Sequence, residues 1–181
     1  MAPLFRKHLH PGEVGSMIYE MLRKCMESDE GLSMESFLQN LGLSQKDLHE
    51  QHAGEIMTGL MFSAVLAIER STPPRTARKI ISGMTEEFVH HLEEQGASTV
   101  QRAEWEVTTA AAFLSYRNSL EDYSGFEPPW KLGRQFYWNL VESKDFPAMS
   151  IKISTLYLIA ARDRVQDLLN EYGPLILSGS S

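Results

Sequence analysis

The sequence predicts an all-α fold, a compact single-domain bundle of about seven helices. Glycine and proline divide the 181 residues into helix-length pieces, and most of these pieces carry apolar residues at helical spacing. No segment shows the clear alternation of apolar and polar residues that a half-buried strand requires. A chain of this length can bury a sizeable core.

The centre of the bundle is predicted from residues 56–68, IMTGLMFSAVLAI, which lie between Glu55 and Glu69. This segment is apolar all the way round, and a helix without a polar face belongs in the interior. We therefore expect a central buried helix over residues 53–70. The apolar run is shorter than the roughly 20 residues that cross a bilayer, so we expect no membrane span.

Before this helix, Pro11 occupies a favourable first helical position and begins an amphipathic helix that ends before Gly31. A short helix follows over about residues 33–41, with a corner at Gly42. A second short helix, capped by Ser44, extends to about residue 51.

After the central helix, Pro73 and Pro74 start a long helix that Gly96 ends. Ser98 and Gln101 form a capping-box pattern that opens a helix to about residue 120. Its apolar residues lie on two sides, with Val100, Ala103, Val107, Ala111 and Leu114 on one and Trp105, Ala112 and Tyr116 on the other. Two more helices are predicted over about residues 130–143 and 147–172, with flexible ends at residues 1–10 and 174–181.

The charge balance and the single cysteine indicate a cytoplasmic protein. With 17 basic and 24 acidic residues, the formal net charge is −7, which disfavours attraction to phosphate backbones and anionic lipid. Cys25 has no intramolecular disulfide partner, as expected in a reducing compartment. The first residues contain no apolar stretch long enough for a signal peptide.

A tight helix-turn-helix is predicted over residues 33–52, where Gly42 provides a turn residue that tolerates positive φ. The apolar positions of the motif are Phe37, Leu41, Leu43 and Leu48. The segment resembles the DNA-binding part of the TetR repressor family, with an amphipathic helix before it and a core helix after it.

This resemblance implies that Gln45, Lys46 and His49 contact DNA, while the remaining helices bind an effector and dimerise. Lys46 is the sole lysine or arginine between residues 33 and 52. Because DNA binding requires cations at the docking face, the net charge of −7 disfavours nucleic acid as a partner.

A protein-binding surface is predicted between residues 123 and 138, where aromatic side chains crowd around a Pro-Pro loop. The helix in this segment can bury only one side, so several aromatic residues remain near the surface, as at many interfaces. The predicted surface comprises Tyr123, Phe126, Trp130, Tyr137 and Trp138.

Acidic residues on apolar faces form a third candidate site. Glu104 lies beside the first apolar side of its helix, and Asp163, Arg164 and Asp167 continue an apolar face of the last helix. A buried carboxylate with a raised pKa can act as a general acid. A solvated helix end and the rim of an apolar stripe are the alternatives.

Histidine and glutamate also recur, but in patterns too sparse for a metal site. Glu87 and His90 have the Glu-x-x-His spacing of di-iron bundles, which require a second copy that this chain lacks. His49, His52 and Glu55 form another loose group. We expect no bound metal and no cofactor.

Together, these patterns predict a small cytoplasmic protein-interaction or regulatory module without catalytic activity, which binds a protein partner or itself. A TetR-like transcription regulator is the first alternative. An all-α enzyme with an acidic site is the second.

Overall fold

The computed structural model describes residues 9–27, 33–43, 50–122, 125, 127–141, 145 and 147–177. These residues form seven α-helices and no strand, which confirms the all-α prediction. The helices are α1 (Pro11–Glu27), α2 (Met34–Asn40), α3 (Glu50–Ser71), α4 (Pro74–Glu94), α5 (Thr99–Glu121), α6 (Pro128–Val141) and α7 (Ala148–Leu177). Most of the two predicted flexible ends, residues 1–10 and 174–181, lies outside the described residues.

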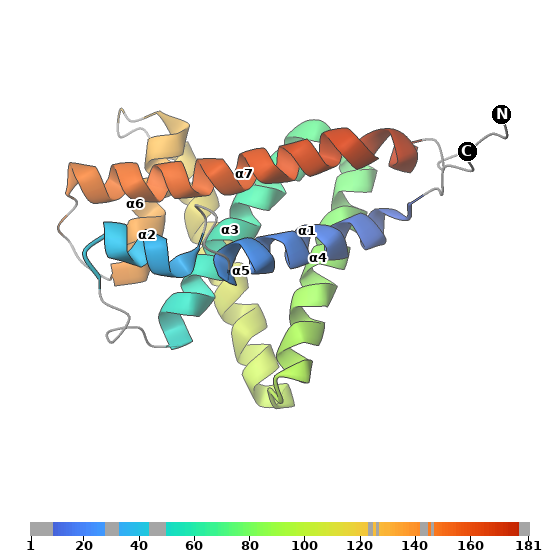
Figure 1. Ribbon diagram of the computed structural model, residues 1–181, viewed down its shortest axis with the longest axis horizontal. Coiled ribbons are helices and arrows are strands. Elements are labelled where there is room, and N and C mark those ends of the chain that lie inside the picture. Colours follow the sequence, from blue (N-terminus) through green and yellow to red (C-terminus); the bar gives the residue numbers. More distant parts are fainter. Residues whose placement is uncertain are drawn as a thin grey trace, which may run out of the picture.

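Helix α3 is the centre of the bundle, as its sequence predicts. From Ile56 to Ile68 every residue is buried except Leu66, which is partly buried. The helix contacts α1, α4, α5, α6 and α7, and Figure 1 shows it crossing the middle of the molecule behind α1 and α7. Because α3 has no polar face, other helices must cover it on every side.

Helices α1 and α4 approach each other more closely than their apolar stripes alone would predict. A Cβ atom on Gly15 of α1 would collide with the backbone of Ile80, and one on Gly83 of α4 would collide with the backbone of Gly12. The two glycines therefore let the helix backbones touch, and any larger side chain at either position would separate them.

The predicted corner after α2 is present. Ser33 caps α2 by accepting a hydrogen bond from the backbone N–H of Ser36 at 3.2 Å, and Gly42 adopts a φ of 74°. Phe37 stacks on Tyr157 of α7 with ring centroids 4.1 Å apart, which anchors α2 on the bundle. The second short helix predicted from Ser44 lies mostly in residues 44–49, outside the described residues.

Helices α4 and α5 form a V-shaped arm. The chain turns at Gly96, which has a φ of 84°. The predicted capping box opens α5: Gln101 N–H donates to Ser98 Oγ at 3.3 Å, and Ser98 N–H donates to Gln101 Oε1 at 2.8 Å. Figure 1 shows that the tip of this arm extends beyond the other helices. The N-terminal half of α5 consequently has little protein around it.

We expect Leu60→Ala to lower the free energy of unfolding by about 2–5 kcal/mol, because it leaves a cavity in the most enclosed helix. Leu60 is 1% exposed. Urea unfolding followed by circular dichroism measures the change. Leu156→Ala is the matched control, since Leu156 is 54% exposed and should change stability little. Equal effects of the two substitutions would contradict the central position of α3.

Candidate functional site

The most conspicuous surface of the molecule is an apolar stripe along α5. Val100, Val107 and Leu114 are 67%, 70% and 60% exposed and lie seven residues apart. Ala103 and Ala110, which fall between them, are exposed as well. The alternating spacing of three and four residues is the heptad pattern by which helices pair. We call these five residues the α5 stripe.

The opposite side of α5 holds the helix on the domain. Ala112 and Tyr116 are buried, and Trp105 meets Phe88 of α4 edge to face with ring centroids 6.0 Å apart. The sequence predicted two apolar sides, and the fold uses one of them. No residue of the α5 stripe belongs to the core of the described chain, so packing among the described residues does not explain its apolar character.

A buried polar network beside α5 was not anticipated from the sequence. Glu55 of α3 accepts hydrogen bonds from the Tyr116 hydroxyl and from Asn139 Nδ2, the latter at 3.1 Å. Asn139 Oδ1 in turn accepts from Gln135 Nε2 at 2.8 Å. The network ties α3, α5 and α6 together, although in the sequence Glu55 appears only as the polar residue before an apolar run and in a loose group with His49 and His52.

Burial governs the ionisation of this network. Desolvation raises the pKa of Glu55, while the hydrogen bonds from Tyr116 and Asn139 oppose the rise. Burial also raises the pKa of Tyr116 well above its ordinary value, and the neighbouring Glu55 adds to this shift. Both groups are thus held toward their protonated forms by the loss of water around them.

The predicted aromatic surface is only partly described. Trp130, Tyr137 and Trp138 are half-buried on α6, whereas Tyr123 and Phe126 lie outside the described residues. The large exposed apolar side chains of the described chain lie instead on α5 and α7.

The predicted DNA-contacting residues, Gln45, Lys46 and His49, also lie outside the described residues. The resemblance to the TetR family therefore stays a prediction.

The predicted acidic site divides between two helices. Glu104 is exposed on α5 at the rim of the α5 stripe. Asp163, Arg164 and Asp167 are exposed on α7, and the Asp163 carboxylate accepts from its neighbour Arg162 at 2.9 Å. The predicted acidic groups are therefore exposed side chains on two different helices.

The histidine and glutamate pairs behave as surface groups. His90 is largely exposed, with its Nε2 atom 3.4 Å from a Glu94 carboxylate oxygen. His91 is half-buried and packs near the Tyr19 ring, with centroids 6.0 Å apart. Among the described residues, no three His, Cys, Asp or Glu side chains converge in a way that could hold a metal ion.

None of the described helices combines the length and the apolar content that crossing a bilayer requires. No protein-family model, curated protein or solved structure matches this chain.

Relative to the native chain, we expect Glu55→Gln to raise the free energy of unfolding by a growing amount as pH rises above about 4.3, the ordinary pKa of a glutamate side chain. Because the pKa of Glu55 is raised in the folded state, its contribution to stability is complete below its unfolded pKa and is lost as pH rises through its folded pKa. Glutamine keeps an oxygen acceptor for Tyr116 and Asn139 but does not ionise.

Urea unfolding of the two chains at several pH values measures this difference. Glu171→Gln, which removes one exposed carboxylate from α7 away from the α5 stripe, is the control for loss of a charge. A difference between the Glu55 variant and the native chain that stays constant with pH would contradict the assignment.

Proposed function

We propose that this protein is a non-catalytic interaction module that associates with a second copy of itself through the α5 stripe. The observation that carries the proposal is the exposure of Val100, Val107 and Leu114 on one face of one helix. Contiguous exposed apolar surface is uncommon on proteins that function alone, and it marks sites of association.

The pattern of the stripe fits a partner helix. From residue 100 to residue 114 it spans about 21 Å at the usual helical rise. Valine and leucine at every seventh position can serve as knobs, while Ala103 and Ala110 leave holes that allow close approach. Its location on a projecting arm also leaves it accessible to another molecule (Figure 1).

A second copy of α5 meets these requirements because it offers the same repeat. Two-fold pairing of identical surfaces is the commonest arrangement in protein oligomers. A parallel arrangement would place Glu104 beside its own copy. An antiparallel arrangement that pairs Val100 with Leu114 places the two Glu104 side chains at different levels along the helix pair, which avoids the repulsion between like charges.

We expect the native chain to show a concentration-dependent monomer–dimer equilibrium in analytical ultracentrifugation. Val107→Glu should weaken the dimer by at least about 100-fold, because it places a charge at the middle of the apolar stripe. The substitution lies at an exposed position, so the monomer should keep its helical circular dichroism spectrum and its unfolding midpoint.

Leu156→Glu is the matched control, since it introduces the same charge at another exposed apolar residue, on α7. It should leave the dimer intact. A native chain that stays monomeric up to about 100 μM, or equal effects of the two substitutions, would overturn the proposal.

A further inference from the structure

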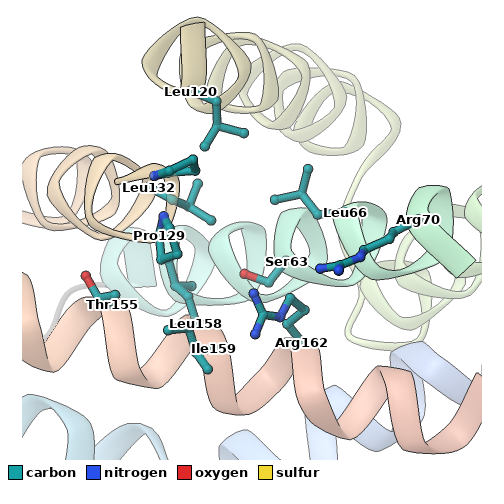
Figure 2. A pocket seen from close by; sticks show the side chains of 11 residues that line it. Ser63, Leu66, Arg70, Leu120, Pro129, Leu132, Thr155, Leu158, Ile159 and Arg162 are labelled. Carbon is teal, nitrogen blue, oxygen red and sulfur yellow. The ribbon is translucent and has the colours of Figure 1, made fainter. Parts of the chain in front are cut away.

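A separate cavity of about 280 Å³ lies between α3, α5, α6 and α7. This volume is near the lower end of the range of small-molecule sites, which begins at roughly 300 Å³. Figure 2 shows side chains from these helices pointing into the cavity. The walls are mainly apolar and include Leu66, Leu120, Pro129, Leu132, Leu158 and Ile159.

Two helices contribute matching series of residues to the cavity. On α3, the cavity is lined by Ser63, Leu66 and Arg70, which lie on one helical face. On α7, it is lined by Thr155 and, seven residues later, by Arg162. Each helix thus contributes a hydroxyl residue followed seven residues later by an arginine. Seven residues of helix correspond to about 10 Å. Beyond the arginines, α3 and α7 are joined by a 2.7 Å hydrogen bond from the Ser71 hydroxyl to the side chain of Gln166. The cavity is therefore an elongated apolar space with cationic groups near one end.

The hydroxyl of Ser63 is the group that points to a ligand. Ser63 is 1% exposed, and its Oγ atom has no hydrogen-bond partner in the described part of the chain. Buried hydroxyls in helices usually bond the carbonyl four residues earlier, as Thr58 does to Gly54 at 2.8 Å and Thr155 does to Ile151 at 2.7 Å. A buried polar group without a partner is costly, and a bound molecule can supply the missing partner.

Two arginines give the cavity a positive end. The Arg70 and Arg162 side chains both line it, and no described acidic residue does. Arg162 shares its charge with Asp163. Arg70 pairs with no described acidic residue, since its neighbour Glu69 is engaged by Arg117. In Figure 2, Ser63 lies between Arg162 and the apolar residues Pro129 and Leu132. Within a chain of net charge −7, this local excess of cations selects for an anion.

We propose that this cavity binds a small amphipathic anion, with an acidic head group at Ser63, Arg70 and Arg162 and an apolar tail among the leucines. A carboxylate or a phosphate monoester can accept a hydrogen bond from the Ser63 hydroxyl and form ion pairs with the guanidinium groups. A straight tail about 10 Å long matches the seven residues of α7 from Arg162 to Thr155, over which this helix lines the cavity. Neutral and cationic amphiphiles lack the negative charge with which the two arginines pair.

Isothermal titration calorimetry with sodium octanoate tests the proposal directly. We expect octanoate to bind the native chain with one site per chain and 1-octanol to bind at least about tenfold more weakly, because it lacks the anionic head. Octyl phosphate identifies the head group: tighter binding than octanoate indicates a phosphate ester, and weaker binding indicates a carboxylate. Failure of both anions to bind at millimolar concentration, or equal binding of 1-octanol, would overturn the proposal.

Arg70→Gln tests the positive charge without disturbing the fold, because the Arg70 side chain is exposed. We expect this variant to bind octanoate at least about tenfold more weakly while its affinity for 1-octanol stays unchanged. Arg75→Gln, an exposed arginine of α4 outside the cavity, removes the same charge and should leave both affinities unchanged. Equal octanoate affinities of the two variants would show that Arg70 does not bind the head group.

Ser63→Ala tests the unpartnered hydroxyl. We expect the affinity for octanoate to fall by roughly 3–10-fold while the midpoint of urea unfolding stays the same or rises, since the hydroxyl has no hydrogen-bond partner among the described residues. Ser154→Ala is the matched control, because Ser154 is also buried without a hydrogen-bond partner among the described residues but does not line the cavity. Unchanged octanoate affinity in Ser63→Ala would exclude Ser63 from the site.

Discussion

The rest of the structure depends on the need to cover α3 on all sides. Because the helix has no polar face from Ile56 to Ile68, five other helices must contact it. Polar groups on α3 then need partners inside the bundle. Glu55 accepts hydrogen bonds from Tyr116 and Asn139. These bonds give its carboxyl group partners inside the bundle, where burial raises its pKa. The hydroxyl of Ser63 has no hydrogen-bond partner among the described residues. It lies instead in the wall of the mainly apolar cavity.

Covering α3 also explains why α5 has two apolar sides with different roles. One side supplies Tyr116 and Ala112 to the core, and this requirement fixes the orientation of the helix. The other side must then face outward, where Val107 is 70% exposed. None of the described helices covers it. The V-shaped arm of α4 and α5 thus presents an apolar heptad pattern to solvent, which is the physical basis for the proposed self-association.

The candidate sites could be predicted from the sequence only where one helix carries them. Four of the five residues of the α5 stripe appear in the sequence as one side of a two-sided helix, with Ala111 predicted where the structure has Ala110, and Glu104 lies at the rim of the stripe. The cavity could not be found in this way, because Arg70 and Arg162 are 92 positions apart and meet only when α3 packs on α7. Within one helix, the sequence offers only the row Ser63, Leu66 and Arg70 on one face of α3. Such a mixture of polar, apolar and basic residues is common on helices and does not by itself indicate a binding site.

The sequence by itself determined the all-α class, the buried central helix, the corner at Gly42 and the capping box at Ser98, because each depends on residues within a few helical turns of one another. Only the tertiary structure decided which apolar side of α5 is buried and which buried hydroxyls lack a partner among the described residues. It also decided that Gly15 and Gly83 bring α1 and α4 into backbone contact. These features depend on which helices become neighbours, and the periodicity of a helix shows that it has a face to bury without showing what will cover that face.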